Sequence, residues 1–538
     1  MGQSPNCYRI TFSDKNDSPY SVNRPEEFLS ARAIAKRERF NIPVIEQDLP
    51  VNPHYIDSIL NFSTEPSQII SKSKWNNSVV IFYPETEDCH TIIDAMLNHF
   101  SFVIDTLPVA YFKLPFISPV PPSTPQSFNP SIPQSFNPSS PCDYDYGNSI
   151  DNIRLHKGHW LHKAGFCGEE MLICVFDAGW DNFNTIPYFK PLYTNGQIWG
   201  TRDLIPGVNN VYIGDKHGTA VTSAMASAIE GQMVGTAPKA NYFLIRALNP
   251  WDYQMVDEDF WAQAAEIADS LGADVINSSL DYGHDIDGPI IYTPDDNTGE
   301  ANIVSRAATI LAHKGVIVVN AAGNEGQTPW HYITFPADAK DILAVGAVNK
   351  FGIVASYSSY GPSADGRVKP DVASPGDGAL GVFSDGRIAQ GVGTSAAAPI
   401  IAGLSACLWQ ALPQFSSLEI MDLIRKYGDR YDNPDDRTGY GIPNFYQCYL
   451  DHTYGVGENV KPEVLVYPNP TTGELRVESG EWKVESVEVF DIYGRKSSSH
   501  HLITSSSNQI NTSHLPAGVY FLKIAAETGI ITKKIIKY

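Results

Sequence analysis

One hydroxyl in this 538-residue chain stands where a glycine-rich loop meets a run of small apolar residues. The segment GVGTSAAAPIIAG places Ser395 there, at the predicted start of a helix. The first turn of a helix offers free N–H groups and the positive end of the helix dipole, which favour a developing oxyanion. Pro399 also falls in this predicted first turn, where a missing N–H would cost nothing. The segment equally fits a buried helix behind a Gly-Thr-Ser cap, so partner residues must decide.

A serine hydroxyl becomes a nucleophile when a base takes its proton and a third group orients that base. His217 lies in DKHGTAVTSAMAS, before an alanine-rich helical pattern, and Asp177 ends the buried-strand pattern MLICVFD. Ligands bind at the carboxyl ends of strands in parallel α/β sheets. Taken singly, the histidine could be an ordinary surface or core residue and the aspartate a simple turn. Together the three predict that Ser395 attacks a carbonyl, with His217 as base and Asp177 orienting it.

Alternating helices and strands are predicted to position these groups. Residues 257–272 have the spacing of an amphipathic helix, with acids in the first turn and a glycine as stop. Residues 300–315 repeat this pattern, and apolar strands follow at 273–279, 316–324 and 341–348. Such alternation predicts an α/β fold, a doubly wound parallel sheet with helices on both faces.

The segments VFDAGW, HGTAVTSAMA and GTSAAAPIIAG resemble the three signature segments of the subtilases, the subtilisin-like serine endopeptidases. The chain order Asp, His, Ser is also that of subtilisin. A fourth segment, VIVVNAAGNEG, resembles the one whose asparagine donates to the oxyanion. The resemblance therefore implies that Asn324 and the Ser395 N–H hold the oxyanion. Removing one such donor costs roughly 3–4 kcal/mol in a subtilisin itself.

The segment ADVINSSLDYG resembles the strand and edge that pair with an extended substrate and wall its primary specificity pocket. This implies that Ser279 and Leu280, with Gly323, lie beside the substrate. Asp281 departs from the pattern, which has glycine where the substrate approaches closely. The chemistry requires no cofactor. Structural calcium is common in the family, and the acidic residues between Asp285 and Glu300 are either a calcium loop or a solvated one, so no metal ligand is assigned.

The length predicts two or three domains. Residues 1–115 read as a small α+β domain that resembles a subtilase propeptide, which would act as an intramolecular inhibitor; an unrelated accessory domain is the alternative. Residues 116–148 are rich in Pro and Ser, contain PQSFNPS twice and predict an exposed linker. Self-cleavage is expected between Phe116 and Asn148. Residues 149–455 form the predicted subtilisin-like peptidase domain.

Residues 461–538 show short alternating strands typical of a small β-sandwich. The motifs VYPNPTTGEL, FDIYGR and LPAGVYFLKI resemble the C-terminal sorting domain of type IX secretion substrates, which implies export by that machinery and a secreted or cell-surface location. A carbohydrate-binding or structural module is the alternative. The opening MGQSPNCYRITF shows no signal peptide, so we expect that a signal was removed or that the start is placed too late; a cytoplasmic enzyme is the other reading.

A net charge of −22 argues against nucleic acid and anionic membranes as partners, and no apolar run is long enough to span a bilayer. The seven cysteines form no metal-ligand spacing; Cys174 and Cys407 read as small buried residues, and Cys142 with Cys167 is a candidate disulfide. The sequence predicts a secreted serine endopeptidase made as a zymogen, acting on protein or peptide substrates through an acyl-enzyme. The alternatives are an inactive subtilase scaffold that binds partners at the surface, and an adhesin whose role is set by the sandwich.

Overall fold

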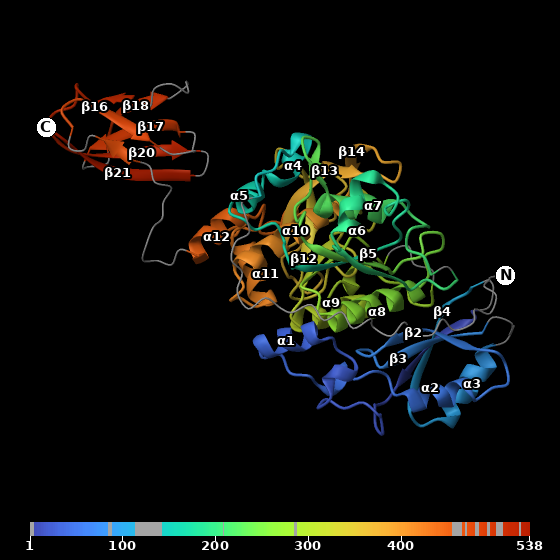
Figure 1. The fold of residues 1–538 in the computed structure, drawn as a ribbon. Helices are drawn as coiled ribbons and strands as arrows, with labels where there is room; N and C mark the ends of the chain where they lie inside the picture. Colours follow the sequence, from blue (N-terminus) through green and yellow to red (C-terminus); the bar gives the residue numbers. More distant parts are fainter. Residues whose placement is uncertain are drawn as a thin grey trace. The chain divides into compact units, whose positions relative to one another are not determined.

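A computed structural model describes residues 5–83, 89–112, 142–207, 209–283 and 288–453. Beyond them it describes 465–467, 471–478, 484–491, 495–501, 509–526 and 529–538. The chain divides into two compact units, Met1–Leu450 and Asp451–Tyr538 (Figure 1). Residues 116–141 of the predicted linker, with both PQSFNPS copies, lie outside the described residues, as does the acidic stretch 284–287.

An eight-stranded sheet organises the first unit, with the order β14-β13-β12-β11-β10-β5-β9-β6. Neighbouring strands are parallel except β13 and β14, which are antiparallel. The predicted α/β fold with a doubly wound parallel sheet is confirmed. The strands are β5 (Leu172–Asp177), β6 (Ile198–Asp203), β9 (Asn241–Arg246), β10 (Val275–Ser278), β11 (Ile317–Ala321), β12 (Leu343–Asn349), β13 (Val372–Val382) and β14 (Ile388–Val392).

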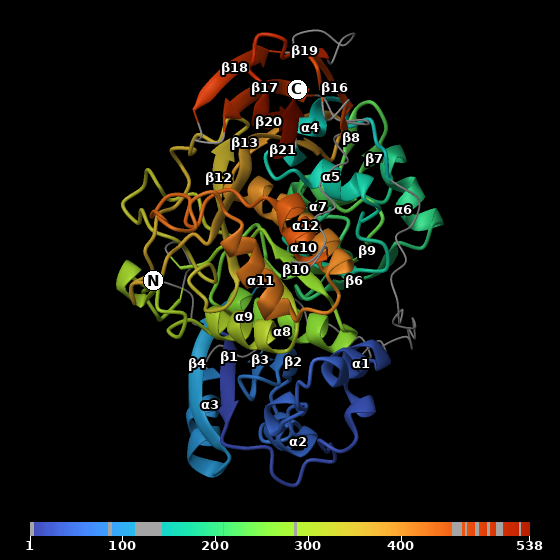
Figure 2. The ribbon, with the colours of Figure 1, turned by 90° about the vertical axis from the view of Figure 1, so that its left-hand side faces the viewer.

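Helices cover both faces of this sheet (Figures 1 and 2). On one face lie α7 (His217–Ala226) and α10 (Thr394–Ala411), and on the other α8 (Val256–Leu271) and α9 (Ile303–His313). Gly272 ends α8 in the left-handed conformation, with φ 76°. The shorter elements of this unit are α4 (Ile150–Ile153), α5 (Gly158–Lys163), α6 (Lys190–Thr194), β7 (Ala228–Ile229), β8 (Met233–Val234), α11 (Ser417–Lys426) and α12 (Phe445–Thr453), which runs past the unit boundary.

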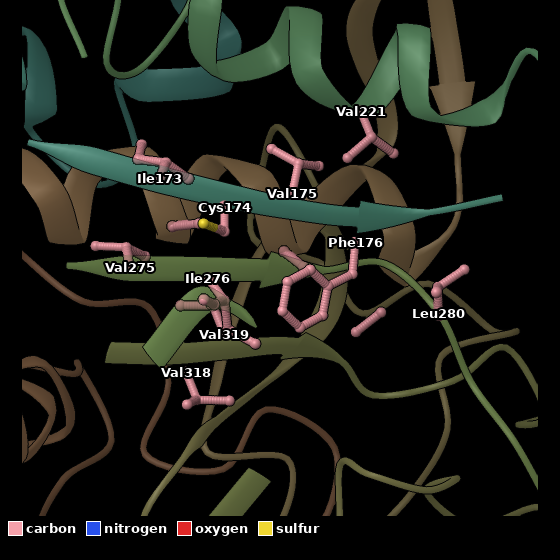
Figure 3. Packing of buried hydrophobic residues seen from close by; sticks show 14 of the residues in the cluster. Ile173, Cys174, Val175, Phe176, Val221, Val275, Ile276, Leu280, Val318 and Val319 are labelled. Atoms are coloured by element: carbon pink, nitrogen blue, oxygen red, sulfur yellow. The ribbon is translucent and has the colours of Figure 1, made fainter. Parts of the chain in front are cut away.

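The central strands are buried along their whole length, which is why they read as unbroken apolar runs. All six residues of β5 are buried, as are all of β10 and β11. Figure 3 shows Ile173 and Val175 of β5 packed beside Val275 and Ile276 of β10, with Val221 of α7 above them. A parallel strand covered on both faces has no solvent side on which polar residues would alternate.

The N-terminal segment, residues 5–112, packs against α8 (Figure 2). Its antiparallel sheet has the order β2-β3-β1-β4. One side of it forms a small core with α2 and α3, while Trp75, Phe82 and Phe112 join the main core. The elements are β1 (Cys7–Phe12), α1 (Ala31–Arg39), α2 (Pro53–Leu60), β2 (Gln68–Ser73), β3 (Ser78–Phe82), α3 (Cys89–His99) and β4 (Val103–Ala110).

Buried polar contacts join the N-terminal segment to α8. Arg9 of β1 donates two hydrogen bonds of 2.7 Å to the Asp259 carboxylate. The Glu266 carboxylate accepts the backbone N–H groups of Lys74 and Trp75 at 2.8 and 3.0 Å, in the turn between β2 and β3. All these side chains are under a tenth exposed, so water competes weakly for the bonds.

A second contact is made by α1 through alternating charges, here called the five-residue ion chain: Lys74, Asp269, Arg37, Asp48 and Lys314. Its successive links measure 2.8, 2.8, 2.9 and 2.9 Å. Every member is under 10% exposed. Asp269 and Lys314 belong to the sheet-bearing part and the other three to the N-terminal segment. Three of the four links therefore cross between the two parts.

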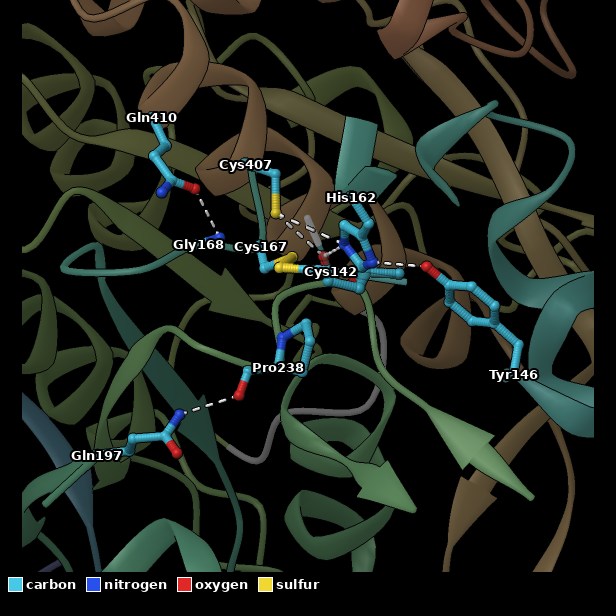
Figure 4. The surroundings of a disulfide bond; sticks show 10 residues. Cys142, Tyr146, His162, Cys167, Gly168, Gln197, Pro238, Cys407 and Gln410 are labelled. Carbon is cyan, nitrogen blue, oxygen red and sulfur yellow. Dashed lines mark hydrogen bonds between the residues drawn. A yellow bond between two sulfur atoms is a disulfide. The ribbon is translucent and has the colours of Figure 1, made fainter. Parts of the chain in front are cut away.

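A disulfide joins Cys142 to Cys167 and fixes the chain that follows the undescribed stretch (Figure 4). Next to it, the Tyr146 hydroxyl lies 2.7 Å from Nδ1 of the buried His162. Residues 142–148 thus belong to the body that carries the large sheet. Among the described residues, the five remaining cysteines form no disulfide and are buried, as predicted for Cys174 and Cys407.

The second unit consists of two antiparallel sheets, β15-β16-β19 and β18-β17-β20-β21. Leu475 and Ile510 of the first sheet share a buried core with Val487 and Leu522 of the second, so the sheets pack face to face as a sandwich. The strands are β15 (Leu465–Tyr467), β16 (Glu474–Glu478), β17 (Val484–Asp491), β18 (Lys496–His501), β19 (Gln509–Asn511), β20 (Gly518–Ala526) and β21 (Gly529–Lys537).

Candidate active site

The sheet order brings the predicted site residues to one edge. Asp177 ends β5, Ser279 follows β10 and Asn324 lies just beyond β11, and these three strands are neighbours. They are parallel, so their carboxyl ends lie side by side. Helices α7 and α10 begin at the same edge, with His217 as the first residue of α7 and Ser395 as the second of α10.

His217 and Asp177 are joined directly. His217 Nδ1 lies 2.9 and 3.0 Å from the two carboxylate oxygens of Asp177. Asp177 is fully buried, and its Oδ1 also accepts the Ala178 N–H at 2.8 Å. The His217 side chain is 37% exposed, and the contact with Asp177 fixes the orientation of its ring. In the neutral imidazole this contact assigns the N–H to Nδ1 and leaves Nε2 as a proton acceptor.

Glycine allows this close approach. A Cβ on Gly218, the second residue of α7, would lie 2.5 Å from the Gly179 carbonyl oxygen. The Gly218 N–H instead donates to that oxygen at 3.0 Å. The HG pair of the motif is therefore required for α7 to begin against the loop that follows Asp177.

Burial by itself would lower the pKa of His217, because it disfavours the imidazolium. The Asp177 carboxylate outweighs burial and, with Asp215 and Asp281, raises that pKa to about 9. Burial also raises the pKa of Asp177, against the stabilising effect of His217. The pair therefore holds a proton on His217 up to a pH above the ordinary histidine range.

Ser395 is held at its carbonyl by Ser279. Pro399 lies inside α10, so our prediction that it occupies a first turn without a missing bond is wrong. An amide at position 399 would have bonded to the Ser395 carbonyl four residues earlier. That carbonyl instead accepts the Ser279 hydroxyl at 2.9 Å. Proline thus opens the helix ladder at Ser395, and the edge following β10 takes the vacated place.

Thr394 fixes the orientation of Asn324, a role that the sequence analysis missed. The Thr394 N–H and hydroxyl donate to Asn324 Oδ1 at 2.9 and 3.2 Å. Two donors identify that atom as the oxygen, so Nδ2 is the group left to donate elsewhere. Asn324 is exposed. A Cβ on Gly393 would lie 2.8 Å from the Ser395 hydroxyl oxygen and 3.6 Å from Asn324 Oδ1, so both atoms lie close to this glycine. The hydroxyl of a threonine directly before the predicted nucleophile was the available signal.

The expected substrate-side residues lie around this point. Ser279 is 7% and Leu280 4% exposed, and the Leu280 carbonyl accepts Asn320 Nδ2 at 3.2 Å. Gly323 has φ 104°, and a Cβ there would lie 2.6 Å from Thr334 Oγ1. Within the described residues, no hydrogen bond joins His217 to Ser395; such bonds often tighten only when substrate binds.

No group of three His, Cys, Asp or Glu residues in the described part of the chain could hold a metal ion. Asp285 and Asp287 of the expected calcium loop lie outside that part. Calcium therefore stays a prediction.

Three family models match the chain. The subtilase family matches residues 168–441, the peptidase S8 propeptide domain of Bacteroidota residues 7–113, and the secretion system C-terminal sorting domain residues 465–538. The first match covers more than half of the chain, which therefore belongs to the subtilase family. The third match marks it as a secreted or cell-surface protein. In the residues that the structure describes, no helix has the length and apolar character needed to cross a membrane.

Curated relatives agree with this assignment. Subtilisin NAT of Bacillus subtilis subsp. natto is 28% identical over 284 residues, covering 52% of this chain and 66% of that protein. The thermophilic serine proteinase of Bacillus sp. (strain AK1) is 30% identical over 299 residues, covering 54% and 63%. The membrane-bound transcription factor site-1 protease of Mus musculus is 29% identical over 249 residues, covering 45% and 21%. The matched region spans at most 66% of the length of these relatives.

Proposed function

We propose that the protein is a secreted serine endopeptidase, made as a zymogen and exported by type IX secretion. The observation that carries this proposal is a single sheet edge, at which one helix begins with a histidine bound to a buried aspartate and another begins with the segment that holds Ser395. The subtilase, propeptide and sorting-domain matches support the same conclusion. Protein or peptide substrates, the protein's own propeptide and the export machinery are the partners that it implies.

In the proposed reaction, His217 Nε2 takes the Ser395 proton as the hydroxyl attacks the substrate carbonyl. Asn324 Nδ2 and the Ser395 N–H bind the oxyanion, and Thr394 keeps the amide turned toward it. The tetrahedral adduct collapses when His217 passes the proton to the leaving amine. A water then attacks the acyl-enzyme with His217 again as base. Asp177 stabilises the imidazolium in both halves.

Maturation is proposed to cut the chain before Cys142. The described part of the expected cleavage range, residues 142–148, is tied to the peptidase domain by the disulfide and by Tyr146. At the other end, Tyr111 exchanges two hydrogen bonds with the Gln254 side chain at 2.6 and 3.1 Å. The propeptide is thus bound to the peptidase domain as far as Tyr111, and the bond that is cut would lie after Tyr111 and before Cys142.

The deciding experiment is Ser395→Ala in the full chain, with Ser405→Ala as matched control. Ser405 lies in the same helix, and its hydroxyl donates only to the Ile401 carbonyl at 2.7 Å. Ser395→Ala should abolish casein hydrolysis, leave the propeptide uncut and lose fluorophosphonate labelling, whereas Ser405→Ala should retain all three. If Ser395→Ala hydrolysed casein at the wild-type rate, the assignment of Ser395 as nucleophile would be wrong. An unlabelled, inactive wild-type protein would favour the inactive scaffold.

Deleting the residues after about 460 distinguishes a sorting domain from an adhesin. The proposed function expects export to fail while the peptidase stays active. An adhesin would instead lose its function with export unaffected.

A further inference from the structure

Asp281 stands where the resemblance to subtilases leads one to expect glycine, and its neighbours fix its position. It lies two residues beyond Ser279, on the edge that follows β10. The next residue, Tyr282, exchanges backbone hydrogen bonds with Phe335 at 2.9 and 3.1 Å. Within this bridge the Thr334 hydroxyl donates to Asp281 Oδ2 at 3.4 Å. These hydrogen bonds fix the segment that carries Asp281, and the residue itself is half-buried.

The same threonine connects Asp281 to the oxyanion site. Thr334 donates its N–H to the Ala322 carbonyl at 3.2 Å, and its hydroxyl lies 2.6 Å from where a Cβ of Gly323 would be. Gly323 directly precedes the proposed oxyanion donor, Asn324. With the substrate carbonyl bound at Asn324, as proposed, the side chain of that substrate residue would lie beside Gly323 and Thr334. The carboxylate of Asp281 is one hydrogen bond away from that place.

The charge of Asp281 also reaches the base. It is one of the three carboxylates that raise the pKa of His217, with Asp177 and Asp215. The Asp281 carboxylate would therefore attract a cationic substrate side chain that enters this partly desolvated site. An acidic side chain would meet repulsion, and a neutral one would gain no such attraction.

We propose that Asp281 is a specificity-determining residue that selects lysine or arginine as the substrate residue before the cleaved bond. This inference rests on the proposed peptidase function. It names a substrate class, peptides with a basic residue at the cleavage point. Glu325, next to Asn324, is the competing acid; its Oε2 accepts the Thr328 hydroxyl at 2.7 Å, a shorter contact than the 3.4 Å between Thr334 and Asp281.

The test uses the processed enzyme and two fluorogenic peptides that differ only at this residue, arginine in one and its neutral isostere citrulline in the other. The wild type should favour arginine by about ten- to a hundredfold in kcat/KM, the range of a hydrogen-bonded ion pair. Asp281→Asn should remove most of this preference, while Glu325→Gln should keep it. Thermal unfolding verifies that both variants are folded.

A second readout is the pH profile, because Asp281→Asn removes a negative charge that favours the imidazolium. The midpoint of the rise in kcat/KM should move to lower pH, an effect that a purely structural role would not cause. A wild type without preference, or a preference that survives Asp281→Asn, overturns the inference and leaves the peptidase assignment standing. Failure of the wild type to cleave either peptide or casein would instead refute the proposed function.

Discussion

Asp269→Asn tests whether the ion chain controls release of the propeptide. Asp269 binds Arg37 and Lys74, both of them in the propeptide, and it makes both contacts across the interface. Asp269 lies in the last turn of α8, where a negative charge is unfavourable to the helix. Losing the charge of this side chain should therefore not destabilise the peptidase domain itself. The substitution therefore weakens the interface rather than either fold.

The expected magnitude follows from which groups lose their partner. Arg37 keeps Asp48 at 2.9 Å, whereas Lys74 loses its ion-pair partner and keeps the Ser270 hydroxyl at 3.3 Å. Removing one partner of a buried pair costs about 3–5 kcal/mol, and we take about 3 because Arg37 stays paired. Since about 1.4 kcal/mol is tenfold, the cut propeptide should dissociate roughly a hundredfold faster.

The assay follows zymogen processing by the lag before casein hydrolysis and by co-elution of the cut propeptide in size-exclusion chromatography. Asp422→Asn is the matched control, because this aspartate is 77% exposed and pairs with Arg425 away from the interface. Asp269→Asn should shorten the lag and lose co-elution. Combination with Lys74→Met should cost less than the sum of the two single effects, because both remove the same pair. Equal lags for Asp269→Asn and Asp422→Asn would refute the reasoning.

Three further predictions concern the site and the disulfide. Because the base must be neutral and the pKa of His217 is raised to about 9, kcat/KM should rise with pH through that value, and a midpoint at or below 6.5 would contradict the influence of Asp177. Asn324→Ala should lower kcat by about 10²–10³-fold with KM little changed, the effect known for the corresponding donor of a subtilisin; Thr394→Val, which keeps the N–H donor, should lower kcat less, and the reverse ranking would argue against the orientation described. Cys142→Ser should lower the free energy of unfolding by about 3 kcal/mol under oxidising conditions, since the bond closes a loop with a separation of 25 residues. Under reducing conditions calorimetry should find no difference between the variant and the wild type, because the bond is then absent from both.

The sequence was most informative where function restricts the residue type. The runs MLICVFD and VIVVNAAGN predicted strands that end in polar residues, and the alternating pattern correctly predicted the sheet that sets Asp177 and Asn324 at one edge. Pro399 was misplaced because the start of α10 decides which carbonyl loses its partner, and a helix boundary is not readable to one residue.

The contacts of α1 could not be predicted from the sequence. Arg32, Lys36 and Arg37 give the segment the composition of a solvated helix, yet all three are buried. Their partners lie far along the chain, as with Arg37 and Asp269, which are 232 residues apart. A local pattern carries no information about such a partner, because only the packed interface brings it near.

The cysteines constrain the order in which the chain folds and is oxidised. Disulfides form in oxidising compartments, and a chain oxidised while unfolded would offer every thiol for pairing. In the folded state burial raises the pKa of Cys7, Cys174 and Cys407, so little reactive thiolate is left there. Folding ahead of oxidation leaves Cys142 and Cys167 as the pair to be joined, and the undesired cross-links are then avoided by timing rather than by the absence of thiols.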